Sequence, residues 1–165
     1  MTDLKPATPT DLDAIERLLK EMDAFYGATD FDPPDVRRRQ IDEALFGPVP
    51  AGTALLAWEG TDLAGFAAYS FLWPAVGLTR SLYLKELYVA LAHRQTGVGR
   101  LLMRGLFDLA AEHGCSRVEW TTDTDNEGAL AFYRALGTEM NGGKFFYRAE
   151  GSPPTFETRE EPRPR

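Results

Sequence analysis

The sequence predicts a mixed α/β domain of the α+β type, in which helices flank a mixed central sheet whose first half is mostly antiparallel. Two observations indicate this: strand-like apolar runs gather in the middle of the chain, and amphipathic helical patterns lie before and after them. A length of 165 residues fits one domain, and a hydrophobic content of 44% is enough to form a core. We therefore expect a single domain over residues 1–149, followed by a tail over 150–165 that is rich in proline and charge.

A short strand-like segment starting near Leu4 precedes the first predicted helix. Thr8 suits the N-cap, Pro9 suits the first helical position, and Asp11 can complete a capping box. The helix should end at or just before Gly27. Its buried stripe recurs at helical spacing: Leu12, Ile15, Leu18, Leu19 and Met22. The charged residues between these positions are expected to face solvent: Asp13, Glu16, Arg17 and Lys20.

A second, shorter helix is predicted within residues 33–48. Pro34 lies near its start, and the pair Gly47-Pro48 ends it. Its apolar stripe is only partial: Val36, Ile41, Leu45 and Phe46. The run Arg37-Arg38-Arg39 favours a solvated helix face over a binding patch.

Three strands are predicted next, in the runs 53–60, 62–73 and 81–90, the first two joined by a hairpin turn at "EGTD". The third leads directly into a glycine-containing loop. The remaining predicted elements are a helix that begins at the loop and stops at Gly114, a strand at 116–123, a helix at 126–137 closed by Gly137, and a final strand at 144–150. The sequence strand, loop, helix, strand should form one right-handed crossover.

Gly97 and Gly99 mark the start of the helix after the loop. The first amides of a helix have no partners within the helix and lie at the positive end of its dipole, and glycine lets the backbone approach an anion closely. A phosphate site is one interpretation, and a tight strand-to-helix turn is the other. A dinucleotide fingerprint would need glycine where Leu102 stands, and the Gly-Lys-Ser/Thr ending of a nucleotide-hydrolase loop is absent.

The segment "RQTGVG", residues 94–99, resembles the Arg/Gln-x-x-Gly-x-Gly/Ala pattern with which GNAT N-acetyltransferases bind the pyrophosphate of acetyl-coenzyme A. The resemblance extends from "YLKELYV" to "NEGALAFYRALG", which is similar to the family's Asn-x-x-Ala-x-x-Phe-Tyr-x-x-x-Gly segment. The stretch from Gly65 to Gly99 is similar to the branch that contains the diamine and spermidine/spermine N-acetyltransferases. The resemblance covers the chain up to about residue 149.

This resemblance implies the GNAT fold and acetyl-CoA as co-substrate, and it implies roles for particular residues. The implied pyrophosphate loop comprises Arg94, Gln95, Thr96, Gly97, Val98, Gly99 and Arg100. The backbone of Leu87, Tyr88 and Val89 would pair with the pantetheine arm, and the Val89 amide would donate to the thioester oxygen. Asn126 would contact the coenzyme. Tyr133 would protonate the departing thiolate, although Phe132 and Tyr133 could also be only core aromatics.

A base must take a proton from the attacking amine, because an alkylammonium is not a nucleophile. In "YLKEL", Lys85 stands where the polyamine branch carries a glutamate, and Glu86 stands where it carries an aspartate. Regular alternation would turn these side chains to opposite faces, so Glu86 could replace the missing carboxylate only through a bulge or a shift. Glu86 is thus a candidate base, and a structural ion pair is the alternative.

Composition excludes several classes of function. A net charge of −7 argues against nucleic acid as the main ligand. No apolar run is long enough to span a membrane and the N-terminus lacks a signal-peptide centre, so a cytoplasmic protein without membrane contact is expected. His93 and His113 have no partners at metal-ligand spacing, so no metal is expected.

The leading hypothesis is an acetyl-CoA-dependent N-acetyltransferase acting on the primary amine of a small molecule: a polyamine, a diamine or a lysine-like amino acid. Attack would be direct, in a ternary complex. Lys85 motivates one alternative, a non-catalytic acetyl-CoA-binding regulatory domain; a protein or peptide N-acetyltransferase is the other. Members of the resembling branch commonly pair around the C-terminal strand, so a homodimer is expected.

Overall fold

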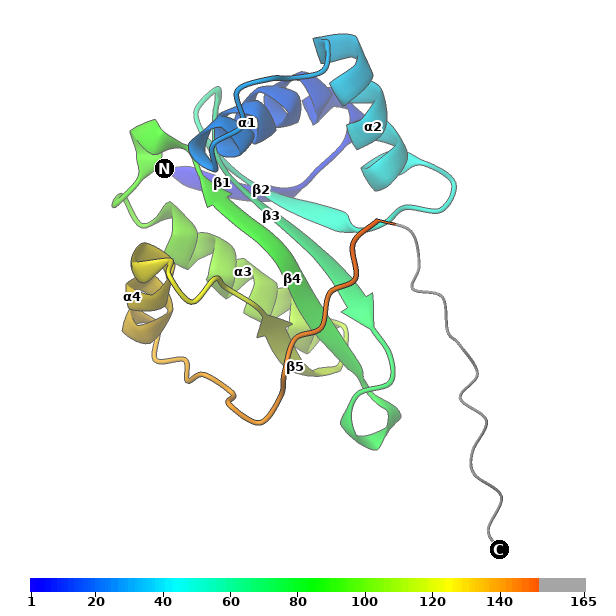
Figure 1. Cartoon of the computed structure of the whole chain (residues 1–165), viewed down its shortest axis with the longest axis vertical. Coiled ribbons are helices and arrows are strands. Elements are labelled where there is room, and N and C mark those ends of the chain that lie inside the picture. Colours follow the sequence, from blue (N-terminus) through cyan, green and yellow to red (C-terminus); the bar gives the residue numbers. More distant parts are fainter. Residues whose placement is uncertain (152–165) are drawn as a thin grey trace, which may run out of the picture. The chain divides into compact units, whose positions relative to one another are not determined.

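The computed structural model describes residues 1–151 and divides into two compact units, Met1–Asn126 and a second that begins at Glu127. The first unit contains all the strands and three of the helices in the described residues (Figure 1). Its elements are β1 (Thr2–Pro6), α1 (Leu12–Phe25), α2 (Pro34–Phe46), β2 (Thr53–Glu59), β3 (Asp62–Leu72), β4 (Arg80–Val89), α3 (Val98–Glu112) and β5 (Cys115–Trp120). Short 3-10 turns lie at Pro9–Asp11, Val76–Leu78 and Leu91–His93.

The strands form one sheet in the order β1-β2-β3-β4-β5. All neighbours are antiparallel except β4 and β5, which are parallel and are connected through α3. This arrangement confirms the mixed sheet with a mostly antiparallel first half. β5 is shorter than the strand predicted at 116–123, because it ends at Trp120.

Helices cover both faces of the sheet in the first unit (Figure 1). On one face, Ile15 and Leu18 of α1 belong to a buried cluster with sheet residues that include Leu56, Phe66 and Tyr88. On the other face, α3 lies so close to β3 that a Cβ on Gly65 would meet Val98 and Leu102 side chains at 2.8 and 2.9 Å. Burial of these apolar side chains supplies the main stabilising term, roughly 1.5–3 kcal/mol for each fully buried one.

The predicted capping pattern is present at the 3-10 turn Pro9–Asp11, which leads into α1 at Leu12. The backbone N–H and the hydroxyl of Thr8 both donate to Asp11 Oδ2, at 2.9 and 2.8 Å. The buried Asp11 carboxylate also accepts a bond from Lys5 Nζ at 2.9 Å. This cluster fixes the direction in which the chain leaves β1 and enters the helix.

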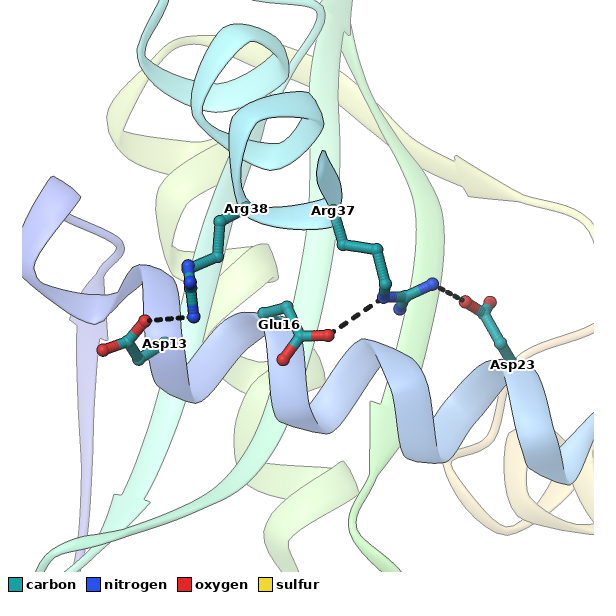
Figure 2. A network of polar contacts seen from close by, with 5 residues as sticks. All are labelled: Asp13, Glu16, Asp23, Arg37 and Arg38. Carbon is teal, nitrogen blue, oxygen red and sulfur yellow. Dashed lines mark hydrogen bonds and ion pairs between the residues drawn. The ribbon is translucent and has the colours of Figure 1, made fainter. Parts of the chain in front are cut away.

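Charged side chains between α1 and α2 depart from the sequence expectation (Figure 2). The Arg37 guanidinium lies 3.0 Å from Glu16 Oε1 and 3.1 Å from Asp23 Oδ2, and only 13% of its side chain is exposed. The prediction that Glu16 and Arg37 face solvent is therefore wrong. Since α2 packs along the flank of α1, it covers positions that helical periodicity alone assigns to solvent.

A β-bulge interrupts β4 at Lys85. Ala68 pairs with Glu86 and Tyr69 pairs with Leu84, so Lys85 is the extra residue. Pairing of β4 with β5 ends at Leu84, opposite Trp120. Beyond the bulge, therefore, β4 continues along β3 while its other edge no longer has β5 beside it.

The second unit contains α4 (Glu127–Ala135), followed by Gly137 at φ +78°, as the sequence predicts. The strand predicted at 144–150 is wrong: residues 138–151 contain no helix or strand. Phe145, Phe146 and Tyr147 are all exposed. Their aromatic character fits a strand, but a strand also needs a neighbour to complete its hydrogen bonds. Nearly all of the predicted tail, from 152 to 165, lies outside the described residues.

Candidate active site

The end of β4 beyond the bulge exposes backbone groups on one edge. Ala90 N–H donates to Ala64 O at 2.9 Å, so the backbone polar groups of Ala90 point toward β3. Successive residues of an antiparallel strand point their backbone groups to alternate sides, so the N–H and C=O of Val89 and Leu87 face away from β3. They face the side that β5 has left.

The loop that follows β4 leaves the first backbone amides of α3 accessible to a ligand. Gly97, at φ +96°, is the N-cap, and Gln95 also has a positive φ of 64°. The first N–H that bonds back into the helix is that of Leu101, to Gly97 O at 3.0 Å. The amides of the preceding turn therefore point out of the helix end, and the space where a Cβ on Gly97 would stand is empty to 4 Å. This geometry suits an anion.

Arg94, the first residue of the loop motif, turns its side chain toward β4 and α1. Its Nε donates to Val89 O at 3.2 Å. The guanidinium carbon lies 4.2 Å from the Phe25 ring centroid and 5.3 Å from that of Tyr88. Such cation–π contacts contribute roughly 0.5–2 kcal/mol each, so this side chain joins three elements.

Glu21 fixes the same region from α1. Its Oε1 accepts a hydrogen bond from the Tyr88 hydroxyl at 3.0 Å and another from Leu91 N–H at 2.8 Å. Burial, followed by the adjacent Glu21 carboxylate, raises the pKa of Tyr88 to about 12. Tyr88 therefore stays a neutral hydrogen-bond donor at physiological pH.

Glu86 is half-buried beside the bulge and pairs across the sheet with Ala68, on the face that α1 covers. Burial raises the pKa of the Glu86 carboxyl above its ordinary value, and the nearby charges of Asp123 and Asp23 raise it further. A bond from Leu87 N–H and the charge of Lys85 act in the opposite direction. The net effect makes Glu86 a better proton acceptor than an exposed glutamate.

These features coincide with a match between residues 15–138 and the acetyltransferase (GNAT) family. The chain belongs to this family. The GNAT proteins use acetyl-CoA, and this chain is accordingly an acetyl-CoA-dependent N-acetyltransferase of amine substrates. The mixed sheet with its helices is the GNAT fold.

Two proteins of similar sequence and one solved structure are compared with this GNAT chain. It is 27% identical to a thialysine N-epsilon-acetyltransferase of Bos taurus, with 90% of this chain and 92% of the relative covered. It is 29% identical to a D-amino-acid N-acetyltransferase of Saccharomyces cerevisiae, with 90% of each covered. An integron cassette protein from the mobile metagenome of V. cholerae has a similar structure, with a TM-score of 0.84, 26% identity, and coverage of 91% of this chain and 93% of that one.

The last two GNAT positions predicted from the sequence lie near and within the second unit. Asn126, which ends the first unit, donates its backbone N–H to Asp123 O at 3.1 Å. Tyr133 lies on α4, where its ring is 5.1 Å from that of Phe132 and its carbonyl accepts a bond from the Thr138 hydroxyl at 2.8 Å. Within the described residues, no group of side chains is arranged to hold a metal ion, and no helix is long and apolar enough to cross a membrane.

Three residues at this GNAT site have no role in the sequence predictions: Glu21 and Phe25 of α1, and Tyr26, which caps the helix. Tyr26 follows the end of α1, and its partial burial and the charge of Glu86 raise the pKa of its hydroxyl. A usable signal existed for the aromatic pair, since Phe25 and Tyr26 extend beyond the apolar stripe at the end of the helix. Glu21 carried no such signal, because a glutamate on a helix is ordinarily solvated.

Proposed function

We propose that this enzyme acetylates the primary amine of a small molecule, namely a polyamine, a diamine or a lysine-like amino acid, by direct attack in a ternary complex. One observation carries the proposal: the edge of β4 at Leu87–Val89, which does not pair with β5, runs directly into the glycine loop that starts α3. An extended ligand arm and a pyrophosphate would thus find adjacent backbone partners. The names of the two sequence relatives, which specify thialysine and D-amino acids, support an amino-acid-like acceptor.

Acetyl-CoA supplies the activated acetyl group as a thioester. The backbone groups of Leu87 and Val89, which face away from β3 on either side of Tyr88, would hold its pantetheine arm. The Val89 N–H would donate to the acetyl carbonyl oxygen, where negative charge develops. The loop Arg94–Arg100 would hold the pyrophosphate, which its outward amides, open glycine position and helix dipole suit. Asn126 would add a contact to the coenzyme.

Glu86 would accept a proton from the ammonium form of the acceptor, directly or through water. Its raised pKa moves the carboxylate closer to the operating pH, which makes proton transfer more effective. The negative charges of Asp23 and Asp123 act on the same site and favour a cationic acceptor. The bulge at Lys85 supports this role, because it supplies the change of register that the sequence requires.

Tyr133 would complete the reaction by donating its phenolic proton to the departing thiolate. A phenol is a suitable donor for this step because it remains protonated at neutral pH. We also propose that the enzyme is a homodimer in which the exposed aromatic segment Phe145–Tyr147 contributes to the interface. Light scattering would show a dimer at micromolar concentration, and a monomer would refute that part.

Lys85 favours a second candidate, a regulatory domain that binds acetyl-CoA without catalysis. A thiol-release assay separates the two. Acetyl-CoA is supplied with polyamines, lysine analogues, aminoglycosides and peptides, using wild type, Tyr133→Phe and the matched control Tyr83→Phe, whose hydroxyl has only a 3.5 Å contact with the Thr121 hydroxyl. We expect one small amine to drive release, Tyr133→Phe to lower kcat by about 100-fold, and the control to match wild type.

Other outcomes of this assay would reject the proposal. Binding of acetyl-CoA without release by any acceptor would favour the regulatory domain. Release with peptides alone would identify a protein N-acetyltransferase. Full activity in Tyr133→Phe would remove the acid role from that residue.

A further inference from the structure

We propose that Arg94 is a positioning residue: its side chain holds the Val89 peptide in place and ties it to the end of α1, instead of neutralising the phosphates of the coenzyme. This inference rests on the proposed function. The side chain of Arg94 would position Val89, whereas the backbone amides further along the loop would bind the phosphates.

The geometry of Arg94 supports this task. The guanidinium is turned inward, with Nε donating to Val89 O at 3.2 Å. The Phe25 ring lies 4.2 Å from the guanidinium carbon, and the Tyr88 ring lies 5.3 Å from it. The two ring centroids are themselves 6.1 Å apart, so the cation lies over two neighbouring aromatic rings. A lysine ammonium could not reproduce both the stacking and the Nε bond.

The bond matters because of what Val89 would do. Its N–H and C=O share one strand edge, and in the proposed reaction the N–H faces the thioester oxygen. β3 holds only the opposite edge, through Ala90 N–H and Ala64 O. Since β5 stops pairing at Leu84, Arg94 takes the place of a neighbouring strand at the Val89 carbonyl.

The same contacts reach the last turn of α1. Phe25 is the final residue of that helix, and Glu21, one turn earlier, bonds both the Tyr88 hydroxyl and the Leu91 amide. The end of α1 is therefore hydrogen-bonded both to β4 and to the turn that follows it. A change at Phe25 should therefore disturb the acetyl site through its contacts with Arg94 and Tyr88.

Kinetics of Arg94→Lys, Arg94→Gln, Phe25→Leu and the Arg94→Lys/Phe25→Leu double variant test the inference, with Arg39→Lys on the exposed side of α2 as control. We expect both Arg94 variants to lower kcat by about 10-fold or more while KM for acetyl-CoA changes less than about 3-fold. Phe25→Leu should lower kcat too, and the double variant should be no worse than Arg94→Lys alone. If Arg94→Lys retains kcat and Arg94→Gln raises KM more than about 10-fold, Arg94 is a phosphate ligand and the inference is wrong.

A second measurement does not depend on the acceptor. The Arg94 Nε–Hε signal of nitrogen-15-labelled protein should be shifted upfield by the Phe25 and Tyr88 rings, and Phe25→Leu should remove most of that shift. On titration with coenzyme A, calorimetry should detect binding while the ring-shifted signal persists. Loss of the shift on binding would overturn the inference. Absence of coenzyme A binding by wild type would reject the proposed function. An unshifted Nε–Hε signal in the free protein, with coenzyme A still bound on titration, would reject the role of Arg94 alone.

Discussion

The hydroxyl of Tyr88 donates a hydrogen bond to Glu21 at 3.0 Å, joining β4 to a helix residue 67 positions earlier in the chain. The same carboxylate oxygen accepts the Leu91 amide at 2.8 Å. One side chain of α1 thereby fixes both the end of strand β4 and the start of the segment that leads to α3. The functional end of β4 is thus held by a long-range contact, which local sequence does not encode.

Removal of this contact should cost stability. Tyr88→Phe deletes one hydrogen bond to a carboxylate, and we expect a loss of about 1.5–3 kcal/mol in the free energy of unfolding. Urea denaturation checks this value. Tyr83→Phe serves as control, because the Tyr83 hydroxyl has only a 3.5 Å contact with the exposed Thr121 hydroxyl and should cost less than about 0.5 kcal/mol. Equal losses in the two variants would contradict the assignment.

Two of the ion pairs between α1 and α2, Arg37–Glu16 and Arg38–Asp13, should differ in strength. Arg37→Met leaves the Glu16 carboxylate, whose side chain is 7% exposed, without its partner, and we expect a loss of about 3–5 kcal/mol. Arg38→Met removes a pair whose side chains are 42% and 70% exposed, so its cost should lie between 0 and about 1 kcal/mol. Thermal and urea unfolding would measure both. Adding Glu16→Gln to Arg37→Met should recover part of the lost stability. If stability is not recovered, the unpaired Glu16 carboxylate is not the cause of the loss.

Glu86 should influence stability in a direction set by its raised pKa. Because the folded state favours the protonated carboxyl, the ionised form destabilises the fold as pH rises from the ordinary glutamate pKa through the raised value. Glu86→Gln should therefore raise Tm at pH 7–8 and lose this advantage below about pH 4, where both states are protonated.

The same Glu86→Gln variant should lose activity. We expect kcat to fall by about 100-fold, while the affinity for coenzyme A stays unchanged. In wild type, kcat/KM should decline toward acid pH, with a midpoint above that of an exposed glutamate. A variant with lower Tm at neutral pH and full activity would show Glu86 to be a structural ion-pair residue.

Close packing of α3 on the sheet gives a test of the loop geometry. A Cβ on Gly65 would lie 2.8 Å from Val98 Cγ1 and 2.9 Å from Leu102 Cδ1, so Gly65→Ala must displace these two side chains in the first turns of α3. We expect a loss of about 1–3 kcal/mol and weaker coenzyme A binding by calorimetry. Gly142→Ala is the matched control, since a Cβ there meets nothing within 4 Å. If Gly65→Ala is destabilised but binds coenzyme A with unchanged affinity, the loop geometry does not depend on the packing of α3 against Gly65.

Much of the fold follows from local signals in the sequence. The Thr8–Asp11 capping pattern, the Gly47-Pro48 stop and the glycine-bounded start of α3 each report on a few adjacent residues, and each prediction is confirmed. The strand expected at 144–150 failed because strand formation depends on a distant partner as much as on aromatic content.

The candidate site was predictable only in part, for the same physical reason. The family pattern over Arg94–Gly99 indicates the loop, and the segment before it indicates β4. The inward turn of Arg94 depends on the aromatic ring of Phe25, which comes from a different part of the chain. The burial of Glu16 likewise depends on α2, which periodicity within α1 cannot reveal.

The position of β1 in the sheet has a consequence for how the protein folds. Thr2 pairs with Glu59, so β1 joins β2 only after a loop that contains both α1 and α2 has closed. β2, β3 and β4, in contrast, are consecutive along the chain and can pair through shorter closures. We expect amides of β3 and β4 to become protected from hydrogen exchange earlier during refolding than those of β1, whose docking completes the sheet.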